Sequence, residues 1–238
     1  MIRGILFDYG NTLVRVRDGA VALRDVLAQL GQKVDETKTS EGMASYKQHW
    51  QYHYAGLPRG ERWTEEIRLD CCKEMLKRLG FASDLDRFAG EVAKRWASNE
   101  RQGMYDDVEP TLGALDEMGI ELGVLSQNTM TGTQLRDDLE TRQIARFFSV
   151  VLTSEDIGYD KPDPRFFEAG SKMIQLKNSE LLYVGNRYHE DVLGARNAGM
   201  TPVLIERGGH RHKTRDCLAL TSLVPLPSIL KDNSEKSA

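Results

Sequence analysis

Short apolar runs that stop at polar residues constrain the fold of this chain more than any other feature. There are five of them, at residues 4–7, 121–125, 149–152, 181–184 and 202–205. Runs of this length without polar interruptions are typical of strands buried on both faces of a parallel sheet. Helix-like segments lie between them, including 111–118 and 164–174. This alternation predicts an α/β fold with a doubly wound, Rossmann-like parallel sheet.

A long helical stretch interrupts this alternation directly after the first strand. It holds no predicted strand and four predicted helices, at 18–31, 36–54, 61–80 and 83–102. The order of elements predicts three parts, namely a core domain formed by 1–16 and 105–230, a helical bundle cap domain at 17–104 and a flexible tail at 231–238. Ligands of such sheets bind beyond the carboxyl ends of the strands. We therefore expect the inserted helices to cover the site as a lid.

Charge and composition narrow the class of partner and the compartment. The net charge is -4 and the pI is about 5.8, without the basic excess that nucleic acid or an anionic membrane surface usually requires. No apolar run approaches the roughly 18 residues of a membrane span, and the N-terminal apolar stretch is too short for a signal peptide. The three cysteines, two of them adjacent, favour a reducing compartment. We expect a cytoplasmic monomer or homodimer that binds neither nucleic acid nor membranes.

Polar side chains follow the predicted strands in an order that suits phosphate chemistry. In chain order they are Asp8, Thr12, Ser126, Lys161, Asn186 and Asp191. The carboxyl ends of parallel strands meet at one edge of the sheet, so we expect these side chains to converge there. Carboxylates, hydroxyls and an ammonium at one edge are what phosphoryl transfer needs, because positioning and charge neutralisation dominate that chemistry.

Four motifs in this sequence resemble those of the haloacid dehalogenase superfamily, whose members mostly transfer phosphoryl groups through an aspartyl-phosphate. They are FDYGNTL at 7–13, VLSQN at 124–128, KPDPRFF at 161–167 and VGNRYHEDVLGARNAGM at 184–200. Together they span nearly the whole chain. The helical insertion lies where this superfamily places one type of cap domain. The resemblance implies a phosphatase-like hydrolase that acts on a small phosphorylated substrate.

The resemblance also implies a role for each candidate residue, with Asp8 as the nucleophile. The implied catalytic residues are Asp8, Thr12, Ser126 and Lys161. The implied phosphate-binding residues are Ser126, Gln127 and Lys161. The implied cofactor is Mg²⁺, held by Asp8, the backbone carbonyl of Gly10, Asn186 and Asp191.

Two positions depart from the common pattern of this superfamily. Gly10 replaces the aspartate that usually acts as general acid and base, and Asn186 replaces an aspartate that usually binds the metal. The usual four aspartates and one lysine carry a charge of -3, whereas Asp8, Asp191 and Lys161 carry -1, so we expect weaker binding of Mg²⁺. Either another group, such as His189 or a cap residue, supplies the proton, or the protein is a slow or inactive relative.

Two alternatives to a phosphatase follow from these departures. The first is a metal-independent 2-haloacid dehalogenase-like hydrolase, against which stand Phe167, where a tyrosine would be expected, and the spacing from Asn186 to Asp191. The second is a catalytically inactive relative that binds a phosphorylated metabolite.

Several other polar groups receive a structural interpretation. His210 and His212 lack nearby cysteine or carboxylate ligands and are interpreted as part of a basic surface loop. The histidine and aromatic positions of the insertion fall at helical spacing, which predicts a helix with one packed face. They are His49, Trp50, His53, Tyr54 and Trp63.

Overall fold

The chain folds into two compact units in the computed structural model, which describes residues 1–57, 64–128, 130–209 and 216–235. The first unit consists of Met1–Arg15 and Met104–Ala238, and the second is Val16–Gly103. We call them the core unit and the helical unit. Trp63, His210 and His212, interpreted above, lie outside the described residues.

A six-stranded sheet forms the centre of the core unit, in the order β5-β4-β1-β6-β7-β8. Its strands are β1 (Gly4–Phe7), β4 (Glu121–Ser126), β5 (Val150–Thr153), β6 (Leu181–Gly185), β7 (Thr201–Ile205) and β8 (Leu218–Leu220). Every neighbouring pair is parallel. The predicted doubly wound parallel sheet is therefore confirmed, and all five predicted strands are present.

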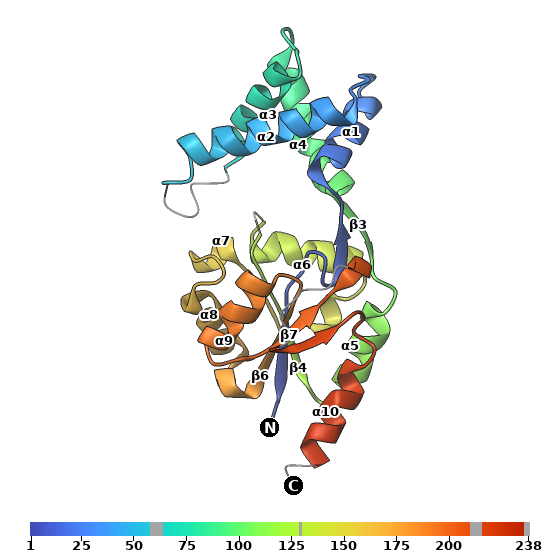
Figure 1. Cartoon of the computed structure of the whole chain (residues 1–238), viewed down its shortest axis with the longest axis vertical. Helices are drawn as coiled ribbons and strands as arrows, with labels where there is room; N and C mark the ends of the chain where they lie inside the picture. Colours follow the sequence, from blue (N-terminus) through green and yellow to red (C-terminus); the bar gives the residue numbers. More distant parts are fainter. Residues whose placement is uncertain (58–63, 129, 210–215, 236–238) are drawn as a thin grey trace. The chain divides into compact units, whose positions relative to one another are not determined.

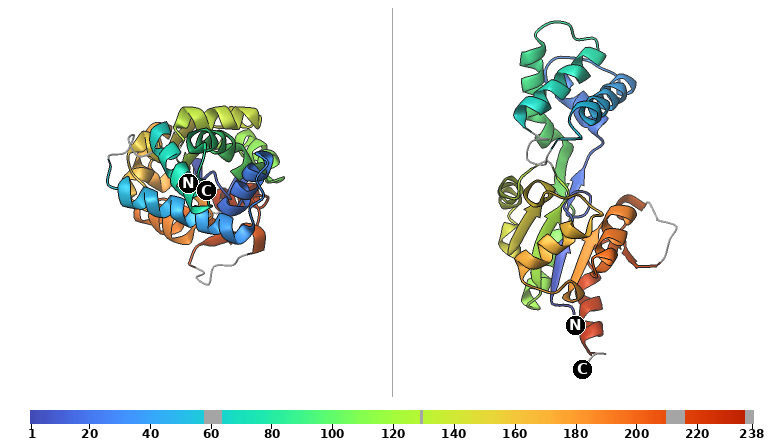
Figure 2. Two further views of the ribbon diagram at one scale, coloured as in Figure 1. Left: turned by 90° about the horizontal axis from the view of Figure 1, so that it is seen from above. Right: turned by 90° about the vertical axis from the view of Figure 1, so that its left-hand side faces the viewer.

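Apolar side chains leave the sheet on both faces, as the uninterrupted runs predict. Ile5 and Phe7 of β1 join one buried cluster with α5 (Val108–Glu117), α6 (Gly132–Thr141) and α10 (Leu226–Glu235). Leu6 joins a second cluster with α8 (Pro164–Ile174) and α9 (Gly194–Asn197). Helices thus cover both faces of the sheet (Figures 1 and 2).

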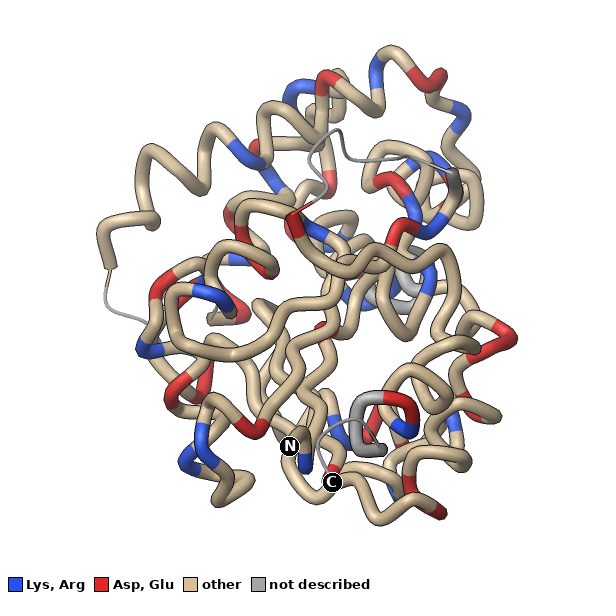
Figure 3. The backbone as a smooth tube through the Cα atoms, turned by 60° about the horizontal axis from the view of Figure 1, so that its bottom comes forward, with Lys and Arg blue, Asp and Glu red and all other residues tan. Residues whose placement is uncertain are grey.

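The helical unit contains the four predicted helices. They are α1 (Gly19–Gln29), α2 (Glu36–His53), α3 (Glu65–Arg78) and α4 (Leu85–Glu100). Three of them begin at side chains that accept hydrogen bonds from the first turn, namely Asp18, Asp35 and Thr64. Their inner faces share one apolar cluster, and both basic and acidic residues occur along the helices (Figure 3). None of the helices in the described ranges is long and apolar enough to cross a membrane.

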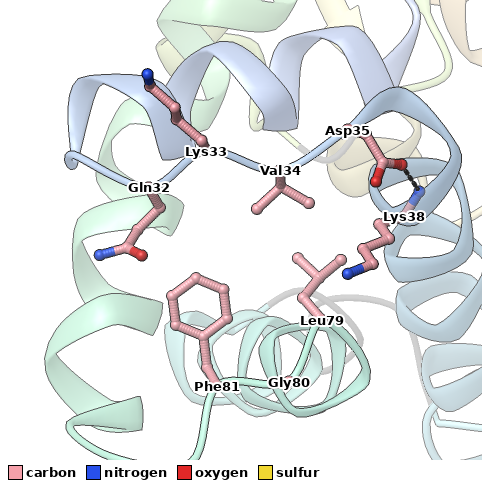
Figure 4. A pocket seen from close by; sticks show the side chains of 8 residues that line it. All are labelled: Gln32, Lys33, Val34, Asp35, Lys38, Leu79, Gly80 and Phe81. Carbon is pink, nitrogen blue, oxygen red and sulfur yellow. Dashed lines mark hydrogen bonds between the residues drawn. The ribbon is translucent and has the colours of Figure 1, made fainter.

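A cavity of about 260 Å³ opens between the segment that joins α1 to α2 and the end of α3 (Figure 4). Its lining combines apolar Val34, Leu79 and Phe81 with the polar residues Gln32, Lys33, Asp35 and Lys38. The two lysines are exposed. None of the site residues predicted from the sequence lines this cavity.

One detail of the predicted organisation is wrong. The helix predicted at 83–102 ends at Glu100, and Arg101–Met104 forms strand β3, which pairs with β2 (Val14–Val16). These are the two segments through which the chain enters and leaves the helical unit, and their pairing satisfies backbone groups that no local helical pattern reveals. Helix α10 extends to Glu235, with Leu226 and Leu230 buried in the core, and the flexibility of the tail from residue 231 stays a prediction.

Candidate active site

Asp8 lies directly beyond the carboxyl end of β1. Its backbone N–H donates to the Val184 carbonyl at 2.8 Å, so the strand pairing holds the residue in place. The chain then turns sharply, with Asn11 in the left-handed region (φ 56°), a conformation that asparagine tolerates better than most residues. This turn brings the Thr12 hydroxyl to 3.4 Å from Asp8 Oδ2. The local sequence therefore aims one carboxylate and one hydroxyl at the same edge of the sheet.

Ser126 ends the neighbouring strand β4 and approaches the same carboxylate. Its hydroxyl donates to Asp8 Oδ1 at 3.3 Å, and the residue is buried. The following loop is fixed by two reciprocal hydrogen bonds, since the Asn128 N–H donates to the Ser154 hydroxyl and that hydroxyl donates to the Asn128 carbonyl. Gln127 lies between these points and is exposed. The structure thus brings Ser126, but not the Gln127 side chain, into contact with Asp8.

Lys161 links two carboxylates across the sheet edge. Its ammonium donates to Asp8 Oδ1 and to Asp191 Oδ1, at 2.7 Å in each case. The exposed fractions of the three side chains are 4% for Lys161, 10% for Asp8 and 1% for Asp191. The ammonium also lies 5.7 Å from the ring centroid of Phe166 and 5.3 Å from that of Tyr183. The lysine is therefore a fixed cation in a closed environment.

Burial and mutual charge together set the protonation of this triad. Burial raises the pKa of Asp8 above its ordinary value, the attraction of Lys161 lowers it, and the like charge of Asp191 raises it again. Burial alone would lower the pKa of Lys161, but Asp191 and Asp8 outweigh it and hold that pKa well above the ordinary value. Two carboxylates around one ammonium leave a net negative charge. Lys161 therefore stays protonated, and the ionised form of Asp8 is less favourable in this site than in water.

Asp191 is held so that one carboxylate oxygen faces Lys161. Its Oδ2 accepts the backbone N–H of Arg187 at 2.8 Å. A Cβ at Gly185 would lie 2.4 Å from the Asp191 carboxyl group, so only glycine permits this approach at the end of β6. Both oxygens of Asp191 are engaged by the protein. The geometry supports Asp191 as the anchor of Lys161, and its role as a metal ligand stays a prediction.

Tyr183 packs beneath this cluster, and no pattern in the sequence predicts this role. The residue is fully buried in β6, and its hydroxyl donates to the Leu125 carbonyl at 2.7 Å. Leu125 directly precedes Ser126, and the Tyr183 ring lies beneath Lys161. One side chain thus contacts the strand that presents Ser126 and the ammonium that binds Asp8. Within the apolar run at 181–184 it resembled an ordinary core residue.

Replacing Tyr183 by phenylalanine is expected to destabilise the protein by about 1–3 kcal/mol, because the buried Leu125 carbonyl loses its donor. Urea unfolding at pH 7 measures this change. Tyr52→Phe is the matched control, since Tyr52 is 83% exposed and its unfolding midpoint should not move. Equal midpoints for Tyr183→Phe and the parent protein would show that this hydrogen bond contributes nothing.

Arg207 fixes the turn after Asp8 from the other side. Its guanidinium donates to the Thr12 carbonyl at 2.9 Å and to both carboxylate oxygens of Asp107, at 2.8 and 2.7 Å. It also lies 4.0 Å from the ring centroid of Tyr105. Asp107 in turn accepts the Leu223 N–H at 2.6 Å. The loop that carries Thr12 is therefore tied to β7, to the start of α5 and to the C-terminal segment.

Oxygen donors of the kind that Mg²⁺ prefers lie on the loops after β1 and β6. Among the described residues, Asp8 Oδ2 has a single side-chain hydrogen-bond neighbour, the Thr12 hydroxyl at 3.4 Å. Neither the Gly10 carbonyl nor the Asn186 amide is hydrogen-bonded to any described residue. The loops start side by side, since Phe7 pairs with Val184. Mg²⁺ commonly takes one or two carboxylates plus waters, and among the described residues no three His, Cys, Asp or Glu side chains form a metal-binding group. The residues present fit Mg²⁺.

A second polar cluster lies in the helical unit at the end of α2. Asp70 of α3 accepts the Tyr54 hydroxyl at 2.6 Å and lies 2.6 Å from His49 Nε2. The hydrogen bond from Tyr54 lowers the pKa of Asp70, and the same bond raises the pKa of Tyr54 to about 12. His53 packs against His49, with ring centroids 4.4 Å apart. The packed helix face predicted here is thus partly a hydrogen-bonded group.

In the core unit, His189 is exposed and makes no hydrogen bond or ion pair with Asp8, whose side-chain partners are Thr12, Ser126 and Lys161.

A buried aspartate beside a fixed lysine and two hydroxyls, at the carboxyl edge of a parallel sheet, suits an enzyme that uses a carboxylate as nucleophile. Comparison with known protein families matches residues 37–205 to the haloacid dehalogenase-like hydrolases. The chain belongs to the haloacid dehalogenase-like hydrolase family, which confirms the resemblance to this superfamily, and the matched residues include the motifs at 124–128, 161–167 and 184–200. Phosphatases of this family generally use Mg²⁺.

Curated relatives and solved structures agree with this assignment. The glyceraldehyde 3-phosphate phosphatase of Methanopyrus kandleri is 38% identical over 107 residues, which cover 45% of each chain. The phosphoserine phosphatase of Thermus thermophilus is 31% identical over 157 residues, or 66% of this chain and 61% of the relative. The match therefore spans about half the length of these relatives. The 2-haloacid dehalogenase of Pseudomonas syringae pv. Tomato superimposes with a TM-score of 0.72 at 23% identity, covering 98% of this chain and 99% of the other, which shows a shared fold.

Proposed function

We propose that this protein is a Mg²⁺-dependent phosphohydrolase that transfers the phosphoryl group of a small phosphate monoester to Asp8 and then to water. The observation that carries the proposal is the Lys161 ammonium, 2.7 Å from both Asp8 and Asp191. It fixes Asp8 beyond the end of β1 with one oxygen directed to Lys161 and Ser126. A carboxylate held in this way is positioned for attack on phosphorus.

The residues of the core unit divide the reaction between them. Asp8 attacks phosphorus, the bond to the leaving oxygen breaks, and water later attacks the aspartyl-phosphate to release phosphate and the free carboxylate. Ser126 and Lys161 hold the phosphoryl oxygens, with Gln127 contributing from the adjoining loop. Thr12 supports the turn and the second oxygen of Asp8. Negative charge on the transferring group is thus met by donors already in place.

Charge balance supports a divalent cation at this site. Asp8, Asp191 and Lys161 sum to -1, which by itself repels a phosphate dianion. Asp8, the Gly10 carbonyl, Asn186 and Asp191 would hold Mg²⁺, whose two positive charges would change the sum to +1 and would offset the negative charge of the phosphoryl group. With a neutral Asn186 in this set, binding of Mg²⁺ should be weaker than at a site with more carboxylates.

The activities for which two relatives are named support a small phosphorylated metabolite as the substrate. One is named for glyceraldehyde 3-phosphate and another for phosphoserine. The dehalogenase alternative has less support, since Phe167 is fully buried against Phe166 and Tyr183 and offers no hydroxyl. The likeness to solved dehalogenases concerns the fold alone. The cytoplasmic location and the monomeric or homodimeric state stay predictions.

The proposal is tested by assaying phosphate release from a panel of small phosphate esters with Mg²⁺ and with excess EDTA. We expect turnover that EDTA abolishes and that added Mg²⁺ restores, with half-maximal activation at millimolar rather than micromolar metal. Release of halide from a 2-haloacid in EDTA would contradict the proposal and favour a dehalogenase. Binding of phosphorylated metabolites without turnover would contradict it in favour of a binding protein.

A further inference from the structure

Among the described residues, the side chain of Asp8 has few partners. This limits which groups could donate a proton to a leaving oxygen. Its oxygens contact the Thr12 and Ser126 hydroxyls and the Lys161 ammonium, and a backbone hydrogen bond comes from Tyr9. Hydroxyls of serine and threonine are poor acids. Lys161 is committed to two carboxylates, and losing its proton would leave both of them buried beside a neutral amine. None of these contacts is suited to give a proton to an alkoxide.

The position two residues after Asp8 adds no donor. Gly10 carries no side chain, and its backbone is bridged to Val14 within the same turn. The hydroxyls of two tyrosines in the core unit have other partners. The Tyr9 hydroxyl donates to Asp138 on α6 and accepts from Arg142, which directly follows that helix, and Tyr183 donates to the Leu125 carbonyl. Within the described part of the core unit, the groups around Asp8 are thus arranged for nucleophilic attack and charge stabilisation.

We propose that the substrates are phosphates whose leaving group departs without protonation, that is, acyl phosphates and phosphate esters of acidic hydroxyls such as phenols and enols. This inference rests on the proposed function of Asp8. Carboxyl groups have pKa values near 4 and phenols near 10, so their anions leave readily. An aliphatic alkoxide is about as basic as hydroxide, far more basic than a phenolate, and it needs an acid that these contacts do not supply.

The proposed steps balance without a proton donor. In the first, a bond forms between an Asp8 oxygen and phosphorus, the bond from phosphorus to the substrate oxygen breaks, and the electron pair leaves as a carboxylate, phenolate or enolate. In the second, water attacks phosphorus and the Asp8 carboxylate departs. Asp8 is itself an acidic leaving group, and the proton of the water ends on phosphate or in solvent. In both steps, the group that leaves phosphorus is therefore the anion of an acidic hydroxyl or carboxyl group.

Two nearly isosteric substrate pairs test the inference on the whole protein with Mg²⁺. Acetyl phosphate is compared with ethyl phosphate, and phenyl phosphate with benzyl phosphate, so that each pair differs mainly in leaving-group acidity. We expect kcat/KM to be higher for the acidic member of each pair by at least about 10²- to 10⁴-fold, the usual contribution of a general acid. Rates are corrected for spontaneous hydrolysis without protein.

Gly10→Asp and Gly10→Asn supply a matched pair of variants. An acid at this position should raise kcat/KM for ethyl and benzyl phosphate and narrow both ratios, whereas the isosteric amide should leave the ratios as in the parent protein. Circular dichroism establishes that both variants are folded, and the ratios measured on the parent protein stand without them. Members of each pair within about threefold of each other would overturn the inference, because a proton donor must then reach the site, while leaving the proposed function intact. No turnover of any of the four substrates would overturn the proposed function itself.

Discussion

Asp8→Asn is expected to reduce turnover of the best substrate by about 10⁴- to 10⁶-fold, the loss typical of removing a nucleophile. The amide oxygen is a poor nucleophile, yet the side chain keeps its size and can still accept from Ser126 and Lys161. Phosphate release at saturating Mg²⁺ measures the change. Asp106→Asn is the control, because the Asp106 side chain is 95% exposed and its loss should leave turnover unchanged.

The same variant should unfold no more easily than the parent protein. Burial raises the pKa of Asp8, so at neutral pH the ionised carboxylate is less favourable in the folded protein than in water. That penalty disappears as the pH falls through the raised pKa towards the ordinary value of about 3.9. Metal-free Asp8→Asn should therefore equal or exceed the parent protein in unfolding free energy at pH 7, and the difference should shrink towards pH 4. A variant clearly less stable at pH 7 would show that Asp8 is a structural residue.

Lys161→Met is expected to cost about 3–5 kcal/mol of unfolding free energy at pH 7, because it leaves Asp8 and Asp191 buried without their cation. Activity should be lost as well, since the same ammonium holds the nucleophile and the phosphoryl oxygens. The cost should shrink as the pH falls and Asp8, whose pKa is raised by burial, takes up a proton. Urea unfolding at pH 7 and pH 5 measures the stability cost and its dependence on pH, and phosphate release measures activity.

Two comparisons make the Lys161 result specific. Lys77→Met removes a lysine from an exposed pair with Glu74 and should cost less than about 1 kcal/mol. Adding Asp8→Asn to Lys161→Met removes one of the orphaned charges and should recover part of the lost stability. A double variant no more stable than Lys161→Met would contradict the charge triad as the source of the effect.

The convergence of the main side chains could be predicted because it follows from topology. The strands that precede Asp8, Ser126 and Asp191 can be recognised in the sequence by their apolar runs. Parallel strands bring the positions that follow them to one edge of the sheet. Lys161 lies on a loop, and only its motif predicts that it belongs to the site. The structure brings these four together with Thr12, whereas Gln127 is exposed and the Asn186 side chain has no hydrogen bond to the described residues.

The supporting contacts could not be predicted from the sequence because they depend on side-chain partners far apart along the chain. Tyr183 has the pattern of a core residue, and its hydrogen bond to Leu125 joins two strands that are not neighbours in the sheet. Arg207 contacts Thr12 across a separation of 195 residues. The pairing of β2 with β3 also joins segments that are far apart along the chain. Local periodicity identifies elements, but tertiary contacts decide these partners.

The central claim, that Asp8 accepts the phosphoryl group, is tested most directly by acid-quenching the protein during turnover of acetyl phosphate with Mg²⁺ and locating the modification by mass spectrometry. The account predicts one added phosphoryl group on the peptide that contains Asp8, labile to hydroxylamine and missing from Asp8→Asn. Turnover without this adduct, or an adduct on a different residue, would contradict it.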